Sequence, residues 1–254
     1  MSKSKKKILS IIFILLMLVC GSILAIEYIN GNKEPDEYKP TPSEVSYKEA
    51  DSEDVTVNQF RVKLAPDVDL NAERKKHNNN DIMGRLEIPG LFNVLVVRSN
   101  NNSYYLDRSI DKKYDVRGTE FLDYRVTPTS KQVNIYGHNS RDTNVKVPFL
   151  KLEKYLDKSF FDSNPYIIFQ HDEGKSLYEI RSIKEISETN NEHMYVSYTG
   201  KDFVAHVNAM TNSPVNSRYV PIEEDSDILV LQTCSHHWSN ALYIIVAVKV
   251  DYEF

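Results

Sequence analysis

The chain has 254 residues, a formal net charge of −5 at neutral pH, 41% hydrophobic residues and 11% aromatic residues. This composition excludes a wholly disordered protein and is sufficient for one folded domain with a buried core. Without the four lysines among the first seven residues, 27 basic residues face 36 acidic ones. The resulting charge of −9 argues against a surface that binds nucleic acid.

The N-terminal segment has the pattern of a membrane anchor. After the basic residues 1–7, residues 8–26 form a stretch of 19 positions without a charge, long enough to cross a bilayer as a helix. The preceding lysines favour a cytoplasmic N-terminus, which places the rest of the chain outside. Residues 23–25 lack the small-residue pattern of a signal-peptide cleavage site, and Val19 does not suit a lipoprotein site at Cys20. We therefore predict an uncleaved, single-pass protein of the cell membrane.

The next two segments are expected to connect the anchor to the folded domain. Residues 27–56 are rich in Glu, Asp, Lys, Pro and Ser and have almost no apolar periodicity, which is typical of an extended, mobile stalk. Residues 57–80 carry scattered apolar positions among charges, which predicts one or two short helices on the flank of the domain. The folded domain, including this flank, is therefore expected over residues 57–254.

From residue 82 onward, short apolar runs rich in Val, Ile, Tyr and Phe alternate with turn residues, which predicts strands. The expected early strands cover 83–88, 92–97, 104–106, 121–126 and 132–136, and the later ones cover 166–170, 177–186, 228–232 and 242–250. Apolar spacing predicts helices over 149–156 and 203–210. The expected fold is mostly β with peripheral helices, as a closed or nearly closed barrel.

Cys234 is the first candidate for chemistry. The chain has two cysteines, and Cys20 lies in the anchor, so Cys234 is the one thiol expected outside the cell. It follows the apolar strand 228–232, where a rigid backbone holds the side chain at a rim, as a nucleophile requires. A buried structural cysteine is the alternative. A nucleophilic thiolate also needs a cation or hydrogen-bonding partner nearby.

His138 is the expected partner. It follows the strand 132–136 and Gly137, so it lies on a loop at a strand end, as Cys234 does. Two strand ends can bring a cysteine and a histidine together at one rim of a barrel. The alternative is an isolated surface histidine.

Both segments resemble the motifs of a known family. Residues 134–139, Asn-Ile-Tyr-Gly-His-Asn, resemble the histidine motif of sortases, and Thr233-Cys234 after an apolar strand resembles their cysteine motif. Residues 81–90 resemble the opening strand of class B sortases. Further similar segments are 104–106, 121–125, 154–156, 160–161 and 165–167. The resemblance runs from residue 81 to the C-terminus in the family's order, and the order of anchor, stalk and domain also agrees.

The resemblance implies an eight-stranded β-barrel with added helices and the activity of a cysteine transpeptidase. In that reaction Cys234 would attack the carbonyl of a Thr in a C-terminal sorting signal of an exported surface protein, of the Asn-Pro-x-Thr type in class B. A thioacyl enzyme would form, and an amine of a peptidoglycan precursor would resolve it. His138 would protonate the departing amine and deprotonate the incoming one. No cofactor is implied.

One family feature is missing. Sortases place an arginine on the last strand after the cysteine, but residues 235–254 contain none. The corresponding position falls near 240–242, where Asn240 alone can donate a hydrogen bond. Other candidate replacements are Arg125, Arg218, His236 and His237. The departure leaves two alternatives open: a catalytically weak, sortase-fold module that binds sorting-signal peptides, and an exported cysteine peptidase.

The adjacent pair His236 and His237 also raises the question of a zinc site with His206 or His138. Neighbouring histidines point in different directions, and no spaced ligand pair accompanies them, so we expect no metal site. Trp238 in the same loop either lines a substrate groove or belongs to the core.

Overall fold

The computed structural model describes residues 41–140, 145–190 and 192–254. The predicted membrane segment, 8–26, and the first part of the predicted stalk lie outside these residues. Within the described ranges, no helix is both long and apolar enough to cross a bilayer.

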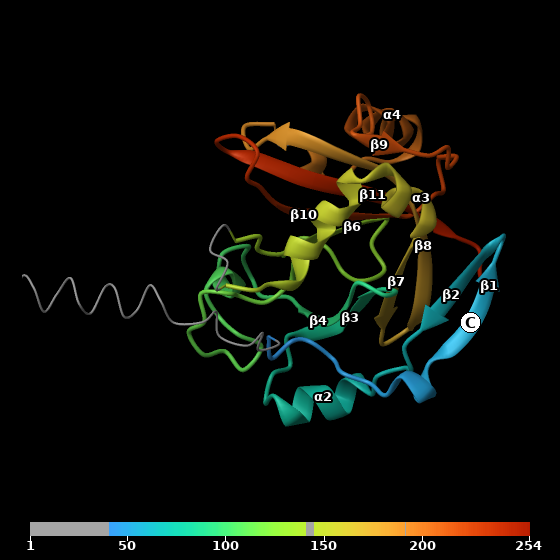
Figure 1. Cartoon of the computed structure of the whole chain (residues 1–254). Helices are drawn as coiled ribbons and strands as arrows, with labels where there is room; N and C mark the ends of the chain where they lie inside the picture. The colour runs from blue at the N-terminus through green and yellow to red at the C-terminus, as the bar shows by residue number, and fades with distance from the viewer. Residues whose placement is uncertain (1–40, 141–144, 191) are drawn as a thin grey trace, which may run out of the picture. The chain divides into compact units, whose positions relative to one another are not determined.

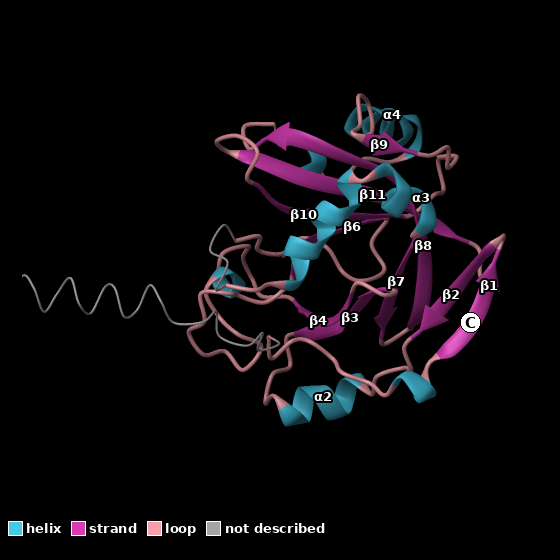
Figure 2. Cartoon of the chain, viewed as in Figure 1, coloured by secondary structure: helices cyan, strands magenta, loops and turns pink. Residues whose placement is uncertain are grey.

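Eight strands form a closed barrel (Figures 1 and 2). They are β3 (Ile82–Ile88), β4 (Phe92–Val97), β5 (Phe121–Leu122), β6 (Gln132–Tyr136), β7 (Tyr166–His171), β8 (Gly174–Ser187), β10 (Ile228–Ser235) and β11 (Ala241–Val250). Their order is β11-β10-β6-β5-β4-β3-β7-β8, and pairing of β8 with β11 closes the ring. The short β9 (Asn216–Ser217) adds to β8 outside the ring. The expectation of an eight-stranded barrel is confirmed.

Helices surround the strands. The α-helices are α2 (Leu70–Lys76), α3 (Lys158–Ser163) and α4 (Gly200–Met210), and the 3-10 helices are η1 (Glu49–Asp51), η2 (Tyr104–Leu106), η3 (Pro148–Leu156) and η4 (Glu192–Met194). Figure 2 shows α2 and α4 on opposite sides of the strands in this view. The helices expected over 149–156 and 203–210 are thus present, the first as a 3-10 helix.

Alternation along β10 decides which side chains face the interior. Leu229 and Leu231 join the interior core, to which all eight strands of the ring contribute. Val230 points outward and is covered by α4. Because successive side chains of a strand point to opposite faces, Cys234 belongs to the same outer face as Val230.

Two local predictions were wrong and one was incomplete, each for a local reason. One short helix expected over 57–80 is present as α2. The prediction did not include the hairpin that residues 53–64 form from β1 (Glu53–Val57) and β2 (Phe60–Leu64), with a left-handed Asn58 in its turn (φ 52°). The apolar positions 60, 62 and 64 repeat every second residue, which is a strand pattern rather than a helical one.

The other two differences lie at η2 and β5. The expected strand at 104–106 is the 3-10 helix η2, because the Asn101 side chain accepts the amide hydrogens of Ser103 and Tyr104 and starts a turn. The expected strand 121–126 ends after Leu122, where the Val126 amide donates to the Asp123 carbonyl in a turn.

The part of the predicted stalk that the structure describes packs on the barrel. The Leu95 amide donates to the Ser43 carbonyl at 2.8 Å, and the Val45 amide donates to the Asn93 carbonyl at 2.9 Å. The Ser43 hydroxyl donates to the Glu120 carboxylate at 3.2 Å, and burial raises the pKa of Glu120 to about 7. Ordered contacts of the domain therefore begin by residue 41, rather than at residue 57.

Candidate active site

Cys234 lies on the outer face of the barrel at the end of β10. It pairs with Leu242 on β11, which in turn pairs with Ile186 on β8. The cysteine is exposed, whereas its neighbours Thr233 and Ser235 are 2% and 3% exposed. The two buried neighbours hold the backbone in place, so the thiol is presented from a rigid strand.

The structure brings His138 to the same rim. Strand β6 runs parallel to β10, Tyr136 pairs with Gln232, and the Gly137 amide donates to the Gln232 carbonyl at 3.2 Å. Continuing this register by two residues places His138 beside Cys234 on neighbouring chain segments, which lie about 4.8 Å apart in a sheet. By alternation, Cys234 and Tyr136 belong to the outer face, and His138 follows two residues after the end of β6. The predicted meeting of the two strand ends is therefore seen in the strand register.

The imidazole of His138 is oriented by the η2 loop. Its Nε2 lies 2.6 Å from the Leu106 carbonyl oxygen. Because a carbonyl oxygen only accepts, Nε2 carries the proton, and Nδ1 is the basic nitrogen of the neutral ring. Gly118 lies at the same edge of the imidazole, since a Cβ atom there would lie 2.9 Å from the Leu106 carbonyl oxygen and 3.0 Å from Cδ2. The sequence alone gave no signal for the contacts of Leu106 and Gly118 with the imidazole.

The thiol of Cys234 is not activated by its surroundings at rest. Partial burial raises its pKa, and the nearby Glu188 carboxylate raises it further. The protonated thiol is therefore the resting form near neutral pH, and nucleophilic attack requires a base to remove its proton.

Arg125 is engaged away from Cys234. Its guanidinium pairs with Asp123 at 2.7 Å and donates to the Met194 carbonyl. The burial of Asp123 favours its neutral form, yet hydrogen bonds, above all from Arg125, lower the pKa of Asp123 to about 2. The Asp123 amide donates to the Asn134 carbonyl, four residues before His138, or about 13 Å along a strand.

Arg218 is likewise engaged elsewhere. Its guanidinium donates to the Phe161 carbonyl and lies over the Phe161 ring at 4.5 Å. The preceding residue, Ser217, pairs with Ser182 on β8, four residues before Ile186 and about 13 Å from it along the strand. Among the described residues, these are the partners of the two guanidinium groups, rather than Cys234 or His138.

The loop after β10 holds the remaining candidates. The ring of His237 lies 3.5 Å from the Glu185 carboxylate and 3.2 Å from the Tyr243 hydroxyl. Asn240 has a left-handed backbone (φ 58°), and its carbonyl accepts the Glu188 amide at 2.7 Å, so its described contact is a turn contact of the main chain. His236 has a buried Nε2 without a hydrogen-bond partner among the described residues.

Trp238 and His206 lie outside the pairing of Cys234 with His138. Trp238 is 43% exposed, which excludes it from the core. His206 lies on the buried face of α4, and its Nε2 is 3.1 Å from the Gln132 side-chain oxygen. Over the described ranges, no three His, Cys, Asp or Glu side chains gather as a metal site.

The outer face beside Cys234 is apolar on one side and polar on the other. Ile186, Leu242 and Ile244 form an aliphatic cluster next to the cysteine. His193, from the connection between β8 and α4, bonds to Gln232, and burial lowers the pKa of this histidine. No sequence motif pointed to His193, because its place depends on the path of a loop between distant elements.

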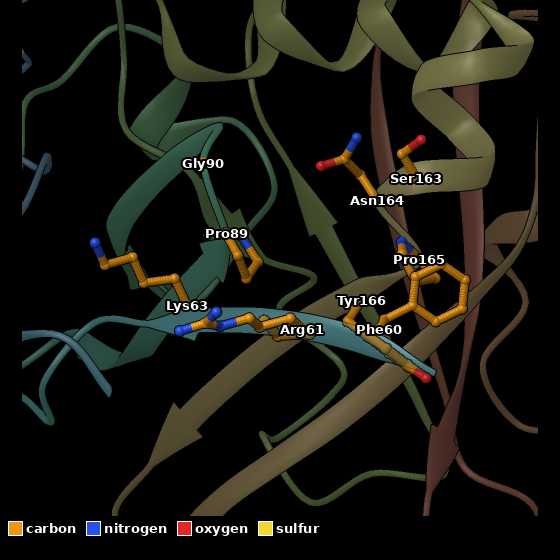
Figure 3. A pocket seen from close by; sticks show the side chains of 10 residues that line it. Phe60, Arg61, Lys63, Pro89, Gly90, Ser163, Asn164, Pro165 and Tyr166 are labelled. Carbon is orange, nitrogen blue, oxygen red and sulfur yellow. The ribbon is translucent and has the colours of Figure 1, made fainter. Parts of the chain in front are cut away.

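A separate cavity of about 200 Å³ lies at another part of the barrel. Figure 3 shows its lining, which includes Phe60, Arg61, Pro89 and Tyr166, and we call it the hairpin pocket. Tyr166 pairs with Glu179 on β8, seven residues from Ile186, or about 23 Å along the strand. The hairpin pocket is therefore remote from Cys234.

Comparisons with known proteins address the fold. No protein-family model matches the sequence. No curated protein matches it either. Sortase B from Clostridium perfringens is similar in structure, with a TM-score of 0.65 at 22% identity over 71% of this chain and 100% of that one.

Two further solved structures are similar. One is a sortase B–substrate complex from Staphylococcus aureus, with a TM-score of 0.62 at 21% identity over 72% of this chain and 92% of that one. The other is a Streptococcus pyogenes class B sortase involved in pilus biogenesis, with a TM-score of 0.62 at 21% identity over 72% of this chain and 98% of that one. Barrel closure, strand order and these likenesses agree, and the chain has a class B-like sortase fold.

Proposed function

We propose that this chain is a cysteine transpeptidase of the sortase type, with Cys234 as nucleophile and His138 as acid/base. The observation that carries the proposal is the parallel register of β6 and β10, which aligns the two residues at one rim of the barrel. The exposed thiol and the carbonyl-oriented imidazole support it. The sortase fold supports the reaction class.

The reaction proceeds in two acyl transfers. The Cys234 sulfur attacks a peptide carbonyl carbon while its proton passes to Nδ1 of His138. The imidazolium then protonates the departing amine as the C–N bond breaks, which leaves a thioester on Cys234. An incoming amine attacks this thioester, gives a proton to His138, and releases the thiol as the new amide forms.

The partners are proposed from the resemblance and the solved relatives. One similar structure is a sortase B–substrate complex, and another is sortase B complexed with triglycine, a peptide with a free amine. We propose a C-terminal sorting signal of an exported surface protein, cleaved after Thr, as acyl donor. The acceptor is an amine of a cell-wall precursor. The enzyme would work at the outer face of the cell membrane, anchored by residues 8–26.

The missing arginine favours one alternative function. Arg125 and Arg218 are engaged by other partners, and Asn240 uses its backbone in a turn. A chain without a charged group at the oxyanion would bind sorting-signal peptides with slow turnover or none. A cysteine peptidase, in which water replaces the amine, shares the acyl-enzyme.

The test is to incubate the full chain with a library of sorting-signal peptides, with and without an amine acceptor, and to record intact masses. We expect an adduct on Cys234 that passes to the amine, and no adduct with Cys234→Ala. Release of free acid despite abundant amine would indicate the peptidase. Binding without any adduct in a broad library would contradict turnover and favour the binding module.

A further inference from the structure

The side chain of Asn139, next to His138, connects three segments of the chain. It is only 6% exposed. Its Nδ2 donates to the Cys234 carbonyl at 2.9 Å and to the Glu153 carboxylate on η3 at 2.7 Å. One buried amide thus joins the turn after β6, the end of β10 and η3.

The orientation of this amide follows from its neighbours. A carbonyl and a carboxylate oxygen accept hydrogen bonds, so only the NH2 end of Asn139 can face both. An aspartate of the same shape would direct acceptor oxygens at two acceptors, in a part-buried site. Position 139 therefore requires a side chain that donates hydrogen bonds, and a side chain of the same size without donors does not suffice.

The hydrogen bond between Asn139 and Cys234 restrains His138, because the chain is then held on both sides of the histidine. On one side of His138, the Gly137 amide bonds to the Gln232 carbonyl, and Phe149 leaves no space for a Cβ atom at Gly137, with 2.6 Å between them. On the other side, Asn139 is held by Cys234. The backbone of His138 is therefore clamped to β10 both before and after the histidine.

We propose that Asn139 is a positioning residue that holds His138 against Cys234, and that Glu153 holds Asn139. This inference deepens the proposed function and rests on it. Asn139 does not touch the reacting atoms, since it acts through the main chain of Cys234 and the turn that carries His138. Its loss changes how well His138 removes the thiol proton, as well as the stability of the fold.

The experiment measures the rate at which iodoacetamide alkylates Cys234 in the full chain, as a function of pH. The variants are Asn139→Asp, Asn139→Ala, Glu153→Gln and the double variant Asn139→Asp/Glu153→Gln, with His138→Ala as reference. Glu153→Gln is the matched control, because its side-chain oxygen still accepts from Asn139. Thermal unfolding of each variant is recorded alongside.

We expect Asn139→Asp to alkylate about tenfold more slowly at pH 7 and to approach the pH profile of His138→Ala. Glu153→Gln should stay within about threefold of the wild type. The double variant should recover at least about threefold over Asn139→Asp, because the introduced glutamine amide can donate to the introduced aspartate. Asn139→Ala, which introduces no charge, should show the same change of profile if Asn139→Asp fails to fold.

The proposal is overturned if the Asn139 variants keep the wild-type pH profile and lose only thermal stability. It is also overturned if His138→Ala does not change the profile, or if the double variant gains nothing over Asn139→Asp. Alkylation requires no peptide substrate, so it tests the role of Asn139 independently of the transpeptidase proposal. That proposal fails if no peptide acylates the wild-type protein.

Discussion

Two regions of the barrel differ in what they offer to a ligand. The nucleophile rim, defined as Cys234, His138, Asn139 and Leu106, has an exposed thiol with hydrogen-bonded partners around it. The hairpin pocket holds about 200 Å³, yet its Arg61 already pairs with Asp54 at 2.7 Å. The hairpin pocket is a formed cavity without a cysteine or histidine in its lining, whereas the rim carries both.

The difference shows that a formed cavity and the candidate catalytic residues occupy separate parts of this fold. The aromatic rings of Phe60 and Tyr166 meet edge to face at 5.9 Å, so the hairpin pocket lies where β2 packs on the barrel. The rim lies where two parallel strands end side by side.

The largest expected effect is on turnover at the rim. Replacing His138 by alanine should lower the rate of acyl-enzyme formation by about 10²- to 10⁴-fold, because it removes the base for a thiol that rests protonated. The measurement is the rate of adduct formation by intact mass, with Tyr166→Ala as a matched control at a distance. A rate within threefold of wild type would remove His138 from the mechanism.

The second prediction concerns the hairpin pocket. Tyr166 is 2% exposed and packs against Phe60, so Tyr166→Ala should lower the free energy of unfolding by about 3 kcal/mol. Chemical denaturation measures this change. The alkylation rate of Cys234 should stay unchanged under conditions where the variant is folded. A slowed thiol reaction would show that the two regions are coupled.

The third prediction is the pH dependence of the thiol. Burial and Glu188 raise the pKa of Cys234, so its thiolate fraction at a given pH is lower than that of free cysteine. In the His138→Ala background, the alkylation rate should therefore inflect at a higher pH than for a cysteine peptide. Glu188→Gln removes one of the two causes and should move this inflection to lower pH. If the inflection stays at the same pH or moves to higher pH, Glu188 does not raise the pKa of Cys234.

The smallest effect is expected at Arg125. A lysine there keeps the positive charge but not both hydrogen bonds to Asp123, so Arg125→Lys should lower the melting temperature yet leave peptide turnover of the folded variant within about twofold of wild type. Turnover rates from mass spectrometry, with a thermal melt to verify folding, test this expectation. A tenfold loss in a folded protein would instead identify Arg125 as the replacement for the missing arginine.

Part of the fold and site followed directly from the sequence. Short apolar runs bounded by turn residues predicted the long strands β8, β10 and β11, and the continuously apolar runs of β10 and β11 indicated central strands of a sheet or barrel. Cys234 and His138 stood out since each follows an apolar strand. The hairpin of β1 and β2 was missed although Arg61 and Lys63 alternate with the apolar positions 60, 62 and 64, because this pattern covers only five residues and stands among many charges.

The amino-acid sequence by itself determined the alternation of the strands and the places where Cys234 and His138 leave them. Only the tertiary structure decided that β6 and β10 run in parallel as neighbours, which brings two residues 96 positions apart to one rim. It also decided the contacts of Leu106, Asn139 and Glu188. Such contacts depend on loop paths and on main-chain atoms, which every residue possesses, and so they leave no pattern in the order of side chains.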